Sequence, residues 1–100
     1  MGVRFANGQG SLYDKEAPDF PMARVNYQCA ETDATMYTKK RWWGDFSTGE
    51  ELKHLGHFFI EFDDGRRGEC VVIANTEASS KKTKTWYYHF NGRGALTRKR

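Results

Sequence analysis

The sequence has few cysteines, few prolines and no long apolar run. Only two cysteines and two prolines occur among 100 residues. Cys70 lies within an apolar stretch, so we expect two reduced thiols inside the domain, with a Cys29–Cys70 disulfide as the alternative. No 18 successive residues are apolar, and the N-terminal residues lack the apolar core of a secretory signal. We therefore expect a soluble, cytoplasmic protein without a membrane partner.

Catalytic and metal-binding patterns are also scarce. His54 and His57 form an H-x-x-H pair, but no C-x-x-C or H-E-x-x-H pattern supplies the further ligands that a zinc site needs. The two N-G-x-G segments follow no phosphate-binding motif. The adjacent acids Asp63 and Asp64 fit a turn better than an acid–base pair. The sequence thus predicts a protein that is not an enzyme and that holds no cofactor and no metal.

Positive charge is unevenly distributed along the chain. The net charge is +3, yet residues 1–38 contain three basic and five acidic side chains, whereas residues 39–100 contain thirteen and eight. The last 22 residues contain no acid at all. An anionic partner should therefore meet the C-terminal half of the protein first.

The clearest structural signal is a β-hairpin over residues 57–74. Two apolar runs flank Asp64-Gly65, a strong hairpin signal. A loop wider than two residues would set Ile60 opposite Cys70 and give one wholly apolar face. That face consists of Phe58, Ile60, Phe62, Cys70, Val72 and Ala74. The same register places Glu61 opposite Glu69, a mildly destabilising pair of like charges.

The other elements follow from periodicity. Residues 1–21 are expected to be mostly irregular, apart from a short strand over 3–6. Residues 22–29 and 35–43 alternate as strands of a second hairpin. Ser47-Thr48-Gly49-Glu50 fits a capping box, which predicts a short helix that ends at Gly56.

The C-terminal part is expected to contain a polar loop over 75–83 and a last strand over 84–90. Residues 95–100 should form a disordered basic tail. These elements make a single domain over 1–100 of the α+β class. Its order would be β-β-α-β-β-β, in a mostly antiparallel sheet or a small, partly open barrel.

Aromatic and basic residues alternate on two of these strands, which suggests a function. Cations can follow phosphates while rings stack on unpaired bases, so the pattern favours a small, non-enzymatic domain that binds single-stranded nucleic acid. In each aromatic pair one ring should be exposed, namely Trp43 and Tyr87, while Trp42, Trp86, Tyr88 and Phe90 belong to the core. The predicted binding residues are Lys39, Lys40, Arg41, Trp43, Arg66, Arg67, Lys81, Lys82, Lys84, Tyr87 and Arg93.

Two alternatives use the same residues differently. In the first, the aromatics serve only the core of a small β-rich domain, and the Lys and Arg side chains form an ordinary solvated surface. In the second, a compact inhibitor of the type encoded by phages and plasmids uses exposed Trp and Tyr side chains against a host nuclease or defence complex. An edge strand of the sheet could also pair with a second copy to form a homodimer.

Overall fold

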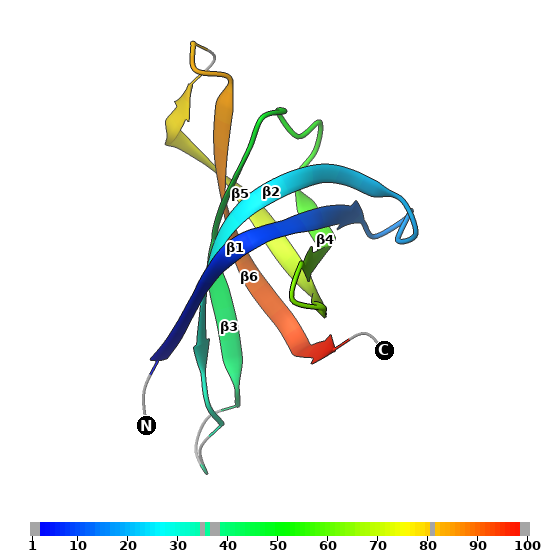
Figure 1. Cartoon of the computed structure of the whole chain (residues 1–100), viewed down its shortest axis with the longest axis vertical. Helices are drawn as coiled ribbons and strands as arrows, with labels where there is room; N and C mark the ends of the chain where they lie inside the picture. Colours follow the sequence, from blue (N-terminus) through cyan, green and yellow to red (C-terminus); the bar gives the residue numbers. More distant parts are fainter. Residues whose placement is uncertain (1–2, 35, 37–38, 81, 99–100) are drawn as a thin grey trace.

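The protein is a closed barrel of six antiparallel strands. The computed structural model describes residues 3–34, 36, 39–80 and 82–98. The strands are β1 (Val3–Asp14), β2 (Pro21–Thr32), β3 (Arg41–Thr48), β4 (Gly56–Phe62), β5 (Arg66–Ser80) and β6 (Thr85–Arg98). They are neighbours in the order β1-β2-β3-β6-β5-β4, and β4 pairs back with β1 to close the barrel (Figure 1).

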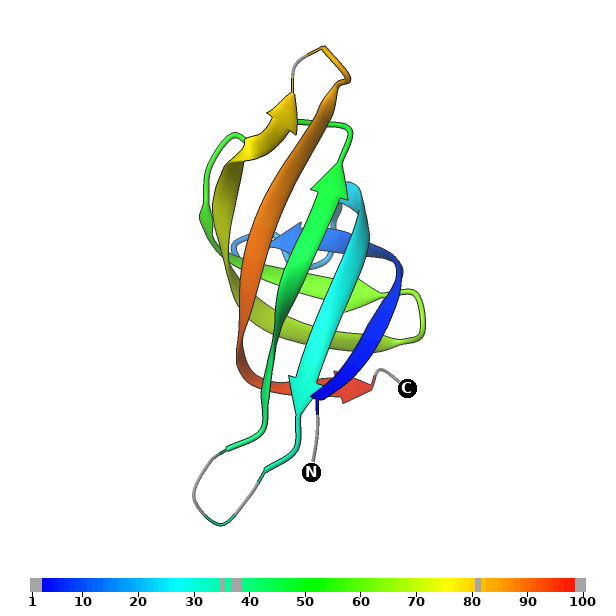
Figure 2. The ribbon, with the colours of Figure 1, turned by 90° about the vertical axis from the view of Figure 1, so that its left-hand side faces the viewer.

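The barrel consists of two three-stranded meanders. β1, β2 and β3 follow one another, and β4, β5 and β6 repeat this arrangement. β3 then pairs with β6 and β1 with β4, so each meander covers the open edge of the other. The connection over residues 49–55 crosses from one meander to the other. The β5–β6 hairpin projects at one end of the long axis and the β2–β3 loop at the opposite end (Figure 2).

The interior is aromatic, as the composition suggested. Phe46, Phe58, Phe62 and Phe90 are all at most 1% exposed, and Tyr27 stacks on Phe62 with ring centroids 4.0 Å apart. Fully burying one such side chain stabilises the fold by about 1.5–3 kcal/mol. Cys29 and Cys70 are both free and buried, which confirms the expectation of two thiols inside the domain. Burial raises the pKa of Cys29 to about 11 and that of Cys70 to about 12.

The prediction of a mostly antiparallel barrel is confirmed, whereas the α+β class and the short helix are wrong. No helix occurs in the described part of the chain. Ser47 and Thr48 end β3, and the connection that follows is held by packing and by the Tyr88 hydroxyl, which accepts a hydrogen bond of 2.9 Å from the Leu52 backbone N–H. A two-turn helix is marginal without tertiary contacts, and here those contacts favour a connection without regular secondary structure.

Two segments with turn-forming residues are strands instead. Residues 7–14, expected to be irregular, continue β1, and residues 91–98 continue β6 beyond the predicted strand and into the predicted tail. The glycines serve close packing: a Cβ on Gly10 would lie 2.5 Å from the Glu61 backbone oxygen, and one on Gly92 would lie 2.0 Å from the Trp42 ring. Residues 75–80, predicted to be a polar loop, also extend β5.

The 57–74 hairpin forms, but in a register shifted by two residues. Ile60 faces Gly68, and Phe58 rather than Ile60 faces Cys70. The loop is a β-turn with a 2.9 Å bond from the Gly65 N–H to the Phe62 carbonyl, and Gly65 has φ +99°. A shift of two keeps every inward side chain inward. Ala74 is the exception. It lies on β5 beyond Val72, the last residue that pairs with β4, and it is exposed.

The same shift removes the expected repulsion between like charges. Glu61 stands opposite Arg67 instead of Glu69, and their side chains lie 3.4 Å apart.

Candidate ligand-binding face

One outer face of the barrel combines amide side chains with exposed rings. It spans β1, β2, β3, β6 and β5. In Figure 2, β2, β3 and β6 lie side by side on the side that faces the viewer. The strand registers align the outward side chains in three rows, which we call the amide–aromatic face. The first row is Phe5, Ala30, Trp43, Asn91 and Val71; the second is Asn7, Gln28, Asp45, His89 and Ile73; the third is Gln9, Asn26, Ser47, Tyr87 and Asn75.

A groove runs along this face. It consists of two adjoining hollows of about 1010 and 520 Å³. Both are lined by Asn7, Gln28 and Asp45, so they form one continuous depression. Trp43 and His89 line the larger hollow, and Tyr87 lines the smaller one. No Lys or Arg is among the described residues that line either hollow.

The rings of this face differ in exposure from their sequence neighbours. Tyr87 is 38% exposed and Phe5 81%, whereas Trp42 and Tyr88 are only 3% and 4% exposed. Trp43 is half-buried on the outside of β3. The Tyr87 backbone N–H donates to the Ser79 hydroxyl at 2.8 Å, which fixes the strand at this point. Tyr87 is therefore exposed and Trp42 and Tyr88 lie inside, as predicted, whereas Trp43 is half-buried instead of exposed.

Asp45 and His89 form a pair at the centre of the groove. They are opposite each other on β3 and β6, and the Asp45 Oδ1 contacts the His89 Nδ1. Both side chains remain accessible, at 52% for Asp45 and 43% for His89. Asp45 is the only carboxylate among the described residues that line the groove.

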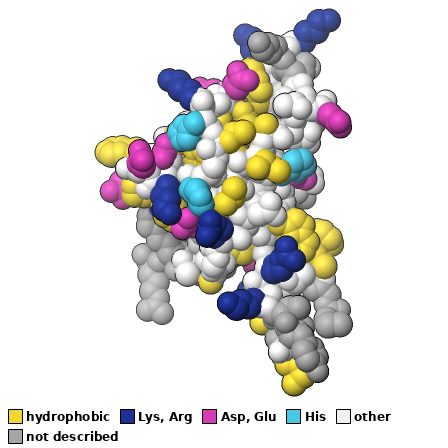
Figure 3. All heavy atoms as spheres, turned by 180° about the vertical axis from the view of Figure 1, so that it is seen from behind, with side chains coloured by type: hydrophobic (Ala, Val, Ile, Leu, Met, Phe, Trp, Pro, Cys, Tyr) yellow, Lys and Arg dark blue, Asp and Glu magenta, His cyan; other side chains and the backbone are white. Residues whose placement is uncertain are grey.

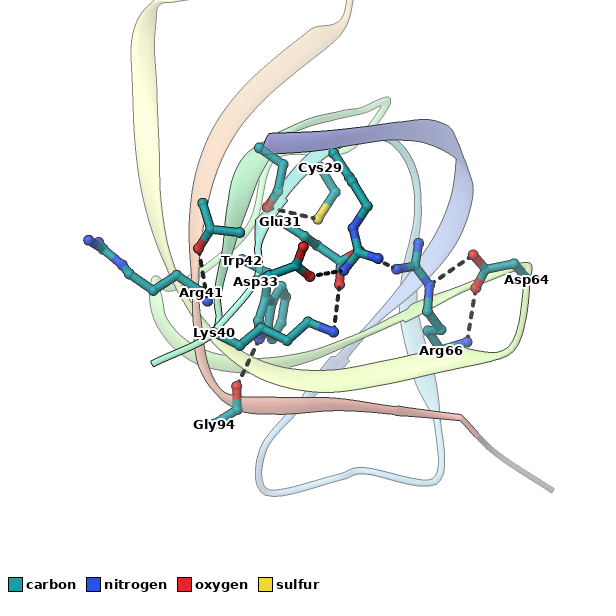
Figure 4. A network of polar contacts seen from close by, with 12 residues as sticks. Cys29, Glu31, Asp33, Lys40, Arg41, Trp42, Asp64, Arg66 and Gly94 are labelled. Carbon is teal, nitrogen blue, oxygen red and sulfur yellow. Dashed lines mark hydrogen bonds and ion pairs between the residues drawn. The ribbon is translucent and has the colours of Figure 1, made fainter. Parts of the chain in front are cut away.

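Two of the predicted binding residues, Arg66 and Arg67, are held in contacts within the protein. The Arg66 side chain is 18% exposed and donates to Glu31 at 2.8 Å and to Asp64 at 3.0 Å (Figure 4). Burial opposes the charge of Arg66, but Asp64 and Glu31 outweigh it, so the pKa of Arg66 is raised. Arg67 donates to the Pro18 carbonyl at 2.7 Å and lies over the Tyr13 ring.

These arginines belong to a larger set of paired charges, which we call the charge-paired hairpin. Arg24 bonds Asp63 at 2.7 Å, and Lys15 bonds Glu69 at 3.1 Å. Every charged residue between positions 61 and 69 of the β4–β5 hairpin thus has an ionic partner. The set is Glu61, Asp63, Asp64, Arg66, Arg67 and Glu69.

Five of the other predicted cations lie near the two ends of the groove. Lys39, Lys40 and Arg41 lie beyond Trp43, where Arg41 is 5.9 Å from the Trp43 ring centroid and Lys40 is 4.0 Å from Glu31. Lys82 and Lys84 are exposed in the β5–β6 hairpin beyond Tyr87, and basic side chains are visible at that end of the molecule (Figure 3).

Arg93 is exposed on β6, two residues beyond Asn91. Lys81 lies outside the described residues. The structure therefore places Trp43 and Tyr87 on the groove and leaves Arg66 and Arg67 away from it. The six other predicted cations among the described residues lie in chain segments that adjoin the groove, namely Lys39, Lys40, Arg41, Lys82, Lys84 and Arg93.

Sequence reasoning missed most of the residues that line the groove. Phe5, Asn7, Gln28, Asp45 and His89 line the larger hollow together with Trp43. A signal was present in the period-two spacing of Asn7 with Gln9 and of Asn26 with Gln28, which puts each pair on one face of a strand. Uncharged amides on an outer strand face usually indicate only solvent exposure, so they attracted no functional interpretation.

Comparison with protein families, with curated proteins and with solved structures gives no match. Among the described residues no group of three or more His, Cys, Asp or Glu side chains is placed to hold a metal ion. The same residues include no helix that is long and apolar enough to cross a membrane.

Proposed function

We propose that the protein is a non-enzymatic module that binds single-stranded nucleic acid along the amide–aromatic face. The observation that carries the proposal is the position of Trp43 and Tyr87 on the neighbouring strands β3 and β6, both facing one groove. Stacking of an unpaired base on an aromatic side chain is worth about 1–3 kcal/mol and depends little on sequence. Stacking on both rings would therefore supply a large part of the free energy of binding.

The spacing of the rings suits an extended strand. Tyr87 stands opposite Ser47, four residues along β3 from Trp43. At about 3.3 Å per residue, the two rings are separated by roughly 13 Å along the groove. Bases can stack at both positions while amides between them donate to and accept from base edges. Both kinds of contact are made to unpaired bases, so the ligand need not be a duplex.

The charge distribution supports bases on the floor and phosphates at the rim. The described residues that line the groove include no Lys or Arg, so the groove itself attracts phosphates weakly. Arg41 and Lys40 lie beyond Trp43, and Lys82 and Lys84 lie beyond Tyr87. Phosphates that leave the groove at either end would meet these cations. Such contacts release counterions, so the affinity should fall steeply with salt.

Fluorescence anisotropy with a labelled 12-nucleotide oligomer tests the proposal. The wild type should bind at low salt, and replacing both rings (Trp43→Ala with Tyr87→Ala) should weaken binding at least tenfold, because neither base can then stack on an aromatic side chain. Phe20→Ala is the matched control, since Phe20 is a ring 74% exposed that does not line the groove. Equal binding by the double variant and the wild type would remove the support for this face.

A second candidate function is binding of a host protein, and it is favoured by the apolar side chains that the groove also exposes. Phe5 is 81% and Ile73 49% exposed, and both line the larger hollow. Exposed apolar side chains beside aromatic anchors are typical of protein interfaces. If an oligomer binds the Phe5→Ser/Ile73→Ser variant as well as it binds the wild type, that result favours nucleic acid as the ligand. Binding of a protein partner would instead be weakened by the loss of both apolar side chains.

A further inference from the structure

The groove has a feature that a sequence-tolerant stacking surface does not need. Asp45 places a carboxylate at the centre of a site proposed for a polyanion. A negative charge there repels phosphates, so it favours binding only if it meets hydrogen-bond donors of the ligand. The donors that a nucleic acid carries are the N–H groups of its bases.

The neighbours of Asp45 complete a hydrogen-bonding pattern. Gln28 stands directly opposite Asp45 on β2, and His89 stands opposite it on β6. His89 contacts Oδ1, and the structure gives the Asp45 Oδ2 no partner within the described part of the chain. Gln28 is exposed, so its amide can donate into the groove. Asp45 and Gln28 therefore offer Oδ2 and the second lone pair of Oδ1 as acceptors, beside one amide donor.

We propose that this set of side chains selects guanine, an inference that rests on the proposed function. The Watson–Crick edge of guanine presents N1–H and N2–H as adjacent donors, followed by the O6 acceptor. The carboxylate of Asp45 accepts from both N–H groups, and Gln28 donates to O6. Trp43, two residues before Asp45 on the same face of β3, stacks on the base.

The other bases fit this set poorly. Adenine and cytosine each place a ring nitrogen acceptor beside their amino group, and that nitrogen faces the carboxylate. Thymine and uracil carry a single N–H between two carbonyl oxygens, which the carboxylate repels. A base acceptor that faces the Asp45 carboxylate makes no hydrogen bond with it and is repelled by its negative charge. Discrimination against these bases thus comes from Asp45 more than from the ring.

The test uses labelled oligomers of twelve thymidines, either unchanged or with one central base replaced by guanine, adenine, cytosine or hypoxanthine. Guanine should improve the affinity roughly tenfold over thymine, as expected for one bidentate contact to a base. Hypoxanthine lacks the N2 amino group and should lose most of that gain. Asp45→Asn should bind all five oligomers alike, because its amide presents a donor to one of the two guanine donors. Gln28→Ala should reduce the preference partially.

The outcomes separate this inference from the proposed function. If the all-thymidine oligomer binds and guanine adds nothing, the guanine site is wrong and the stacking surface stands. A second outcome is that no oligomer of DNA or RNA binds, guanosine monophosphate does bind, and Asp45→Asn abolishes that binding. The guanine site then stands, and its ligand is a free nucleotide. If neither oligomers nor the mononucleotide bind, both proposals fail. A guanine preference that persists in Asp45→Asn would overturn the role of Asp45.

Discussion

The charge-paired hairpin and the amide–aromatic face use polar residues in opposite ways. In the hairpin each charge between positions 61 and 69 has an ionic partner, and Arg66 and Glu31 are nearly buried together, with side chains 18% and 12% exposed. Along the groove the polar groups are mostly uncharged, and no ion pair involves Lys39, Lys82, Lys84 or Arg93 within the described residues. A charge without an ionic partner can meet a ligand without giving one up. The exception on this face is Asp45, which contacts His89 through Oδ1.

The largest effect that distinguishes the two regions is expected from Arg66→Ala. This change leaves the nearly buried Glu31 without its 2.8 Å partner. Removing one partner of a buried hydrogen-bonded pair costs about 1–3 kcal/mol, so the free energy of unfolding in urea should fall by that amount. Affinity for the oligomer should stay within twofold of the wild type. A loss of affinity comparable to that of the ring variant would place Arg66 in the binding surface after all.

An intermediate effect is expected from Lys82→Ala with Lys84→Ala, which tests the opposite region. Both side chains are exposed, so stability should change by less than about 0.5 kcal/mol. The plot of log affinity against log salt should become shallower by about 0.7 for each phosphate of a single strand that no longer meets a cation. Lys15→Ala, a cation paired with Glu69, is the matched control and should leave the slope unchanged. An unchanged slope in the double variant would remove the β5–β6 hairpin from the phosphate path.

The smallest effect is expected from lowering the pH, which should reduce the stability of the protein through the carboxylates of the charge-paired hairpin. The hydrogen bond from Arg24 lowers the pKa of Asp63 below 3.8, and the hydrogen bond from Lys15 lowers the pKa of Glu69 below 4.5. A carboxyl group with a depressed pKa in the folded state stabilises the fold above its unfolded pKa, and this contribution is lost as the pH falls through the folded pKa.

Thermal unfolding followed from pH 6 to pH 3 measures this effect. The midpoint temperature should decline below about pH 4.5, where the unfolded carboxyls begin to bind protons. Asp63→Asn should show a smaller decline than the wild type. The same decline in both proteins would mean that Asp63 contributes nothing to the acid sensitivity.

Several elements could be predicted because their signals are local. The alternation over residues 22–29, the turn residues at Asp64-Gly65 and the distinction between Trp42 and Trp43 each depend on side chains a few positions apart. Each was reproduced, although the 57–74 hairpin pairs two residues away from its predicted register. Alternation fixes which side of a strand faces inward, but a shift of two leaves that pattern unchanged.

The groove could not be predicted, because it depends on which strands become neighbours. Phe5, Gln28, Asp45 and His89 come from four strands that are brought together when β3 pairs with β6. The same closure gives two glycines of the N-G-x-G segments, Gly10 and Gly92, a role in close packing.

The sequence by itself determined that this chain forms antiparallel strands with an aromatic interior, since side-chain periodicity and turn chemistry act over short distances. Only the tertiary structure decided that the barrel closes without a helix, that Arg66 and Arg67 are bound in ion pairs, and that amides and rings share one groove. Pairing between distant strands is set by the packing of the whole core, and no local pattern records it.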